Sequence, residues 1–112
     1  MTGEQMLNWL NREIENVPSR WPGVDLYSYM VRQTEMAARE EREALVVALS
    51  AWLRECREPE SMLAVEIART YRLSELRMDL QWVASEIRAR RAFLPYYEEV
   101  IMKALEALDA AE

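Results

Sequence analysis

The sequence predicts an all-α fold of six antiparallel helices, and three observations favour that class. The residues that dominate the composition are strong helix formers, namely alanine, leucine, glutamate, arginine and methionine. The 112 residues include only two glycines and no Asn-Gly or Asp-Gly pair that would mark a β-hairpin turn. Apolar residues recur every three or four positions, which is the period of a helix. At this length we expect residues 1–112 to form a single all-helical domain.

The first predicted helix covers residues 4–16. Thr2 precedes it and Gln5 follows three positions later, which is the pattern of a capping box. Pro18 ends the helix, because proline has no backbone N–H to continue the hydrogen-bond series. The apolar stripe of this helix comprises Met6, Leu10, Ile14 and Val17.

A loop at residues 18–23 separates the first two helices and contains a Pro-Gly turn pair. Trp21 in this loop has two interpretations: an aromatic anchor folded onto the core, or the lip of a binding surface. Asp25 is placed to cap a second helix. The charged run at residues 39–43 contains no glycine or proline, so it either continues the second helix into the third or marks a bend.

The third predicted helix, at residues 42–56, is apolar nearly all round, and a helix without a polar face is normally the central, buried one. Pro59 opens a fourth helix, Ser74 is expected to cap a fifth, and Pro95 lies in the first turn of a sixth. The stripes of these last three helices are Leu63, Ile67 and Tyr71; Leu76, Leu80, Val83, Ala84 and Ile87; and Tyr97, Val100, Ile101, Ala104, Leu105 and Leu108.

The apolar patterns of the later helices suggest an internal repeat. The third and fifth helices match at an offset of 31 residues, and the fourth and sixth match at an offset of 37. The first offset pairs Leu45 with Leu76 and Val47 with Met78. Similar helix pairs indicate stacked hairpins, although any two amphipathic helices match at some offset. The sequence therefore predicts either a short stack of helical hairpins or an irregular helical bundle.

The segment from Ala64 to Leu80, AVEIARTYRLSELRMDL, resembles HEAT-like helical repeats. In those repeats a helix with paired small residues passes through a short turn into a helix of the form Ser-Glu-Leu-x-x-x-Leu. The resemblance covers residues 43–108 and departs from the family in lacking a proline in the first helix of either unit. It implies two helix-pair units at residues 42–108, an N-terminal cap at residues 1–41, and a protein-binding scaffold.

The composition excludes several kinds of catalytic and metal site. There is no histidine, which rules out Ser-His-Asp and Cys-His catalysis and every histidine-ligated zinc, di-iron or haem site. The single cysteine, Cys56, allows no intramolecular disulfide, and we expect it to be a small buried hydrophobe in the core. We expect no cofactor and no metal. Because no signal peptide or membrane-length apolar run is evident, we expect a cytoplasmic protein without a membrane partner.

The net charge of −6 argues against nucleic-acid binding, because phosphate affinity comes mainly from clustered basic residues. The charge is uneven, since residues 61–91 carry six basic and four acidic groups while both flanking parts are acidic. One hypothesis treats the protein as a regulator whose continuous acidic stripe mimics a nucleic acid. That stripe would comprise Glu40, Glu41, Glu43, Glu55 and Glu58.

Pairs of carboxylates spaced by three residues suggest another function. Each pair could share a helix face and hold Mg²⁺ in a small metal-dependent hydrolase or nucleotide-binding protein. Glutamates at this spacing are also the ordinary surface of a solvated helix, where they pair with arginines. The pairs are Glu40 and Glu43, Glu55 and Glu58, and Glu106 and Asp109.

The fifth predicted helix has a second apolar face, which lies opposite its core stripe and is formed by Met78, Trp82 and Ala89. Either another helix of the same chain covers this face or the face binds a partner. Tryptophan, methionine and arginine are enriched at the centres of protein interfaces.

Three arginines follow this helix and precede Phe93, and they either pair with Glu98 and Glu99 or contact an anion or acidic peptide. The sequence therefore favours a non-catalytic protein–protein interaction or adaptor module that binds a protein partner or forms a homodimer. The candidate partner-binding residues are Met78, Trp82, Arg88, Arg90, Arg91 and Phe93.

Overall fold

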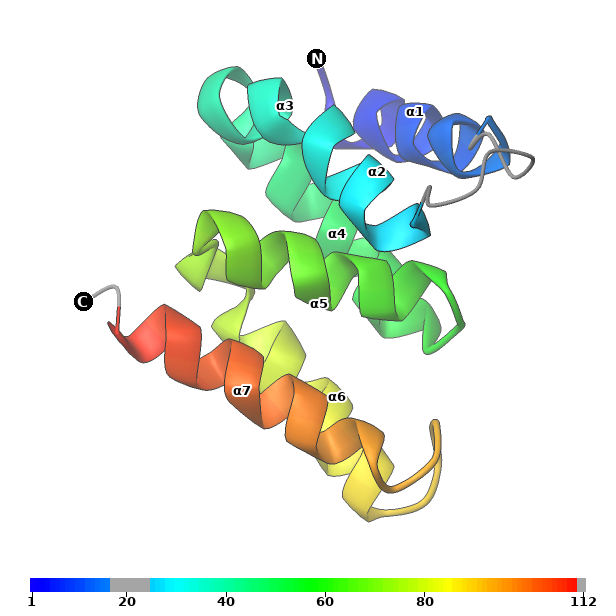
Figure 1. The fold of residues 1–112 in the computed structure, drawn as a ribbon, viewed down its shortest axis with the longest axis vertical. Helices are drawn as coiled ribbons and strands as arrows, with labels where there is room; N and C mark the ends of the chain where they lie inside the picture. The colour runs from blue at the N-terminus through cyan, green and yellow to red at the C-terminus, as the bar shows by residue number, and fades with distance from the viewer. Residues whose placement is uncertain (17–24, 111–112) are drawn as a thin grey trace.

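A computed structural model of the chain describes residues 1–16 and 25–110 (Figure 1). Within these ranges the chain is helical and has no strand, which confirms the predicted all-α class. The predicted loop at residues 18–23, with Trp21, lies outside the described residues, as does Val17. The elements are α1 (Gly3–Glu15), α2 (Leu26–Gln33), α3 (Glu35–Glu40), α4 (Arg42–Glu55), α5 (Glu60–Tyr71), a 3-10 turn η1 (Ser74–Leu76), α6 (Arg77–Arg88) and α7 (Tyr97–Ala110).

Each of the six predicted helical segments is helical, and the second is divided into α2 and α3 at Thr34. The Thr34 side chain is fully buried, and its hydroxyl donates to the carbonyl oxygens of Met30 at 2.9 Å and Val31 at 3.0 Å. A threonine that bonds the preceding turn competes with the backbone series and bends a helix. A second break at Glu41 (φ −131°) separates α3 from α4. The charged run at residues 39–43 is therefore a bend.

The helix starts follow the predicted caps in two cases and differ in a third. Thr2 and Gln5 form the capping box, with backbone-to-side-chain distances of 3.1 and 2.9 Å. Asp25 accepts two backbone hydrogen bonds at the start of α2, each at 3.3 Å. The prediction that Ser74 caps the fifth helix is wrong. This residue begins η1 without a side-chain cap, because the chain enters α6 through a tighter 3-10 turn.

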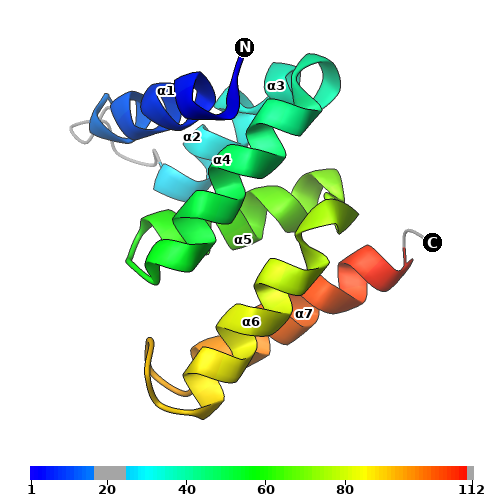
Figure 2. The same ribbon diagram turned by 180° about the vertical axis from the view of Figure 1, so that it is seen from behind.

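The helices pack as three successive pairs, which appear as layers in Figures 1 and 2. The first layer contains α1 and α2, the second α4 and α5, and the third α6 and α7. One row of neighbouring helices is α1, α4 and α6, and the other row is α2, α5 and α7. The nearly all-apolar α4 contacts α1, α3, α5 and α6, so it is the central helix that its sequence predicts.

Polar side chains join neighbouring layers within each row. In the first row the indole N–H of Trp52 donates to Asn11 Oδ1 at 2.9 Å, which links α4 to α1. In the second row the hydroxyl of Tyr71 donates to the carbonyl oxygen of Val31, which links α5 to α2. Because Trp52 is fully buried, this bond satisfies a donor that water cannot reach.

Burial follows the repeat that the sequence suggests, most clearly between α4 and α6. Three pairs at the offset of 31 are fully buried: Leu45 and Leu76, Leu49 and Leu80, and Trp52 and Val83. Val47 and Met78, also paired at this offset, are both exposed, at 54% and 76%. The correspondence between α5 and α7 is weaker, because Leu63 is fully buried whereas Val100 is 41% exposed. The burial pattern therefore matches more closely between α4 and α6 than between α5 and α7.

The described part of the chain contains no candidate for a membrane-spanning helix. None of the helices between residues 1–16 and 25–110 combines the length and the apolar content needed to cross a bilayer.

Candidate interaction surfaces

Met78 on α6 is 76% exposed, more than any other large hydrophobic side chain in the described residues. Trp82, one turn further on, is half-buried and packs against the edge of the core. The guanidinium carbon of Arg54 lies 4.5 Å from the centre of its ring, so α4 partly covers the indole through a cation–π contact. Of the three apolar residues predicted for this face, Met78 and Ala89 are exposed, whereas Trp82 is partly covered.

α4 contributes to the same surface through Val47, which is not among the predicted site residues. Arg42 Nε lies 2.7 Å from Glu75 Oε2, and Ser50 Oγ donates to Asp79 Oδ1 at 3.0 Å. These two bonds tie α4 to η1 and α6 on either side of Val47 and Met78 in sequence, and Figure 2 shows α4 and α6 side by side and running in the same direction. We call this surface the α4/α6 face; it comprises Val47, Arg54, Met78, Asp79 and Trp82.

The charges around the α4/α6 face are paired. Arg54 Nε donates to Asp79 Oδ1 at 2.9 Å, beside the hydrogen bond from Ser50. Arg42 binds Glu75 through two nitrogens, at 2.7 and 2.8 Å. Hydrogen bonding from Arg42 is the main cause that lowers the pKa of Glu75, so this carboxylate stays ionised. The apolar residues of the face therefore lie among charges of both signs.

The three predicted arginines lie away from Met78. Arg88 turns towards α7, where its guanidinium donates to Glu98, as one of the two sequence interpretations expects. Arg91 Nε donates to Glu86 Oε2 at 2.5 Å. Arg90 has a left-handed backbone (φ 60°) and is exposed, and it forms no ion pair with the residues described. The structure thus divides the predicted site residues between the outer face of α6 and its C-terminal end.

Phe93 belongs to an aromatic cluster in the connection between α6 and α7. Its ring centre lies 5.6 Å from that of Tyr97, and Tyr96 stacks on Tyr97 at 4.4 Å. The hydrogen bond to Glu58 is the main cause that raises the pKa of Tyr97, so the phenol stays protonated. Phe93 itself is partly buried against the core, whereas Tyr96 is 62% exposed. Phe93 therefore packs mainly within the protein, whereas Tyr96 reaches solvent.

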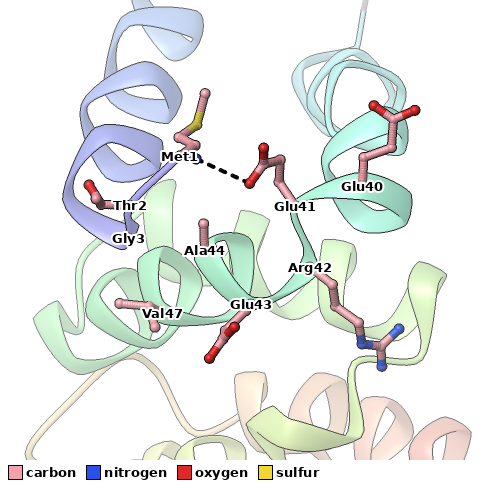
Figure 3. A pocket seen from close by; sticks show the side chains of 9 residues that line it. All are labelled: Met1, Thr2, Gly3, Glu40, Glu41, Arg42, Glu43, Ala44 and Val47. Carbon is pink, nitrogen blue, oxygen red and sulfur yellow. Dashed lines mark ion pairs between the residues drawn. The ribbon is translucent and has the colours of Figure 1, made fainter.

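A pocket at the corner where α1, α3 and α4 meet was not predicted (Figure 3). Its volume is about 380 Å³. The ammonium nitrogen of Met1 lies 3.4 Å from Glu41 Oε2 across one side of it. A smaller apolar pocket of about 170 Å³ adjoins it and shares Met1, Glu40 and Glu41. The bends at Thr34 and Glu41 bring these walls together, and the sequence alone left the second bend undecided.

The predicted carboxylate pairs do not assemble into one site. Glu40 and Glu43 lie on different helices, on either side of the bend at Glu41. Glu55 lies 3.0 Å from Arg57, and Asp109 lies 3.0 Å from Arg77. In the described ranges no group of three or more cysteine, aspartate or glutamate residues is arranged to hold a metal ion. The paired-glutamate hypothesis remains a prediction to which this geometry adds nothing.

The acidic stripe of the nucleic-acid-mimic hypothesis is divided between the two ends of α4. Glu40, Glu41 and Glu43 lie at its start, whereas Glu55 lies at its end. A helix of 14 residues separates these groups by about 20 Å. The five glutamates therefore do not form one continuous stripe.

Cys56 is half-buried and ends α4 in a left-handed conformation (φ 50°), so it is not the core residue that the sequence predicts. Its thiol lies 3.7 Å from the carbonyl oxygen of Leu53. Burial is the main cause that raises the pKa of this thiol, which keeps it protonated at neutral pH. The residue acts as a helix cap.

Comparison with known proteins finds no family model, curated protein or solved structure that matches this chain. The resemblance to HEAT-like repeats therefore remains a prediction.

Proposed function

We propose that the protein is a non-catalytic protein–protein interaction module whose α4/α6 face binds the surface of another protein. The observation that carries this proposal is the exposure of Val47 and Met78 at matching positions on two parallel helices. Contiguous exposed apolar patches rimmed by polar residues mark interaction sites in soluble proteins. Trp82, partly covered by Arg54, supplies the kind of aromatic group that is enriched at interface centres.

Self-association through this face is the form of the proposal that we favour. The chain has a net charge of −6, so most of its surface repels a second copy. The α4/α6 face is an exception, because Arg42 and Arg54 balance Glu75 and Asp79 there. Two copies that meet through this face bring apolar residues together without opposing like charges.

Sedimentation velocity over a concentration series tests the proposal. We expect the wild-type chain to approach twice the monomer mass at high concentration. Met78→Glu places a charge in the apolar contact, so this variant should remain a monomer. Met102→Glu is the matched control, because it makes the same substitution at a partly exposed methionine on α7. The control should associate like the wild type.

A wild-type chain that is monomeric at every concentration would reject self-association. Binding to a different protein is then tested with a photo-crosslinking amino acid at position 78, and at position 102 as the control. Discrete adducts that form only from position 78 support a heterologous partner. Equal labelling from both positions would overturn the proposed role of this face.

A cytoplasmic setting belongs to the same proposal and rests on the sequence alone. A single cysteine, which allows no intramolecular disulfide, fits a reducing compartment.

A further inference from the structure

We propose that the corner between α1, α3 and α4 is a second docking site, and that its ligand is a peptide segment with a bulky apolar side chain next to lysine or arginine. The site combines the two adjoining pockets. We call it the corner groove: its apolar part is Met6, Trp9, Met36 and Ala37, and its acidic rim is Glu40 and Glu43. This inference goes beyond the proposed function, because it concerns another surface and another partner.

The apolar part of the groove has room for one large side chain. Its volume is about 170 Å³, and an apolar protein cavity of about 150 Å³ accommodates a benzene ring. Met6 is buried at its floor, Trp9 is half-buried, and Met36 is 58% exposed at its edge. Methionine side chains adapt to the shape of a ligand and are common at binding surfaces that accept several sequences.

The rim of the groove favours a basic ligand. Glu40 and Glu43 are exposed and form no ion pair with any residue in the described ranges. The arginine between them in sequence, Arg42, points away and binds Glu75 at 2.7 Å (Figure 3). Its charge is therefore already balanced, and the rim keeps a negative potential that attracts lysine or arginine.

One wall of the groove, α3, is held by few buried contacts. α3 has six residues, contains no buried side chain and lacks a side-chain cap at its start. It joins the rest of the molecule through the bends at Thr34 and Glu41. An element with few buried contacts opens at low free energy, so α3 can shift to admit a side chain of varied size.

Selection from a random peptide library displayed on phage, with the wild-type chain as target, identifies the ligand class. We expect the selected peptides to share a bulky apolar residue within a few positions of lysine or arginine. Their binding should weaken as salt is added, because the rim charges are exposed. Selection of acidic peptides, or of none, would overturn the proposal.

Fluorescence anisotropy with a selected peptide then locates the site. We expect Met36→Glu, Glu40→Lys and Glu43→Lys each to raise the Kd about tenfold or more. All three residues are exposed, so the variants should melt like the wild type. Met78→Glu should leave the Kd unchanged, which separates this test from that of the α4/α6 face. Loss of affinity in Met78→Glu alone would assign the peptide to the other face and refute the corner groove.

Discussion

Gly3 lies where α1 closely approaches Val47 of α4. A Cβ atom added there would be 2.3 Å from Val47 Cγ1 and 2.8 Å from Val47 Cβ. Valine is stiff about its first side-chain torsion, so it cannot rotate away from the added methyl group. Val47 thus lines the larger pocket at the corner of α1, α3 and α4 and also borders the α4/α6 face.

Gly3→Ala should therefore destabilise the fold, although alanine is the better helix former. Overpacking costs about 1–3 kcal/mol, and alanine recovers less than about 1 kcal/mol at a helix end. We expect a net loss of about 1 kcal/mol in the free energy of unfolding, measured by urea titration. The double variant Gly3→Ala with Val47→Ala should recover part of this loss. A stabilised single variant would show that α1 moves away without cost.

Residue-scale features were predictable where the signal is local. The caps at Thr2 and Asp25 depend on residues within three positions, so the sequence contains all the information. The exposure of Val47 depends on where α1 and α6 lie beside α4, and the apolar pattern of α4 hides it. The one local signal is that Val47 corresponds to Met78 at the offset of 31 residues.

At the scale of elements, the pair Arg42 and Glu75 joins the start of α4 to η1. The bond from Arg42 lowers the pKa of Glu75 relative to the unfolded chain. A carboxylate with a lowered folded pKa adds stability above its unfolded pKa, and this stability is lost as the pH falls through the folded value. Both side chains are more than 40% exposed, so the effect is small and sensitive to salt.

Glu75→Gln tests this link through its pH dependence. We expect the variant to unfold at a lower urea concentration than the wild type at pH 7. The difference should shrink as the pH falls below about 4.3, the usual value for glutamate, because the wild-type carboxyl then loses its charge. A difference that stays constant from pH 7 to pH 3 would show that the ion pair does not stabilise the fold.

Helix identity was predictable and helix boundaries less so. The 3.6-residue period specifies which segments are helical, but the division at Thr34 depends on a buried hydroxyl that bonds two carbonyls. Ser74 has the residue type of a cap, yet the chain adopts a 3-10 turn there. The first difference arises from a side chain that bonds the preceding turn, and the second from a tighter local turn, and the apolar period reveals neither.

At the scale of the whole molecule, the layered arrangement determines which surfaces are free. α4 and α5 lie between the other two layers, so their side chains are buried from several directions. The corner groove forms because the bends on either side of α3 set this helix apart from α1 and α4. The apolar stripe of each helix can be read from the sequence. The groove, however, depends on the relative positions of α1, α3 and α4, which no single stripe specifies.

Amide hydrogen exchange should reveal this layering. Leu49, in the middle of α4, is fully buried and should exchange only when the whole molecule unfolds. Ala38 in α3 donates its amide to Thr34 at 2.9 Å but belongs to a helix with no buried side chain. It should exchange through local opening, more than about a hundredfold faster than Leu49. Equal protection at both amides, measured by NMR, would show that α3 opens only with the core, and it would remove the movable wall from the corner groove.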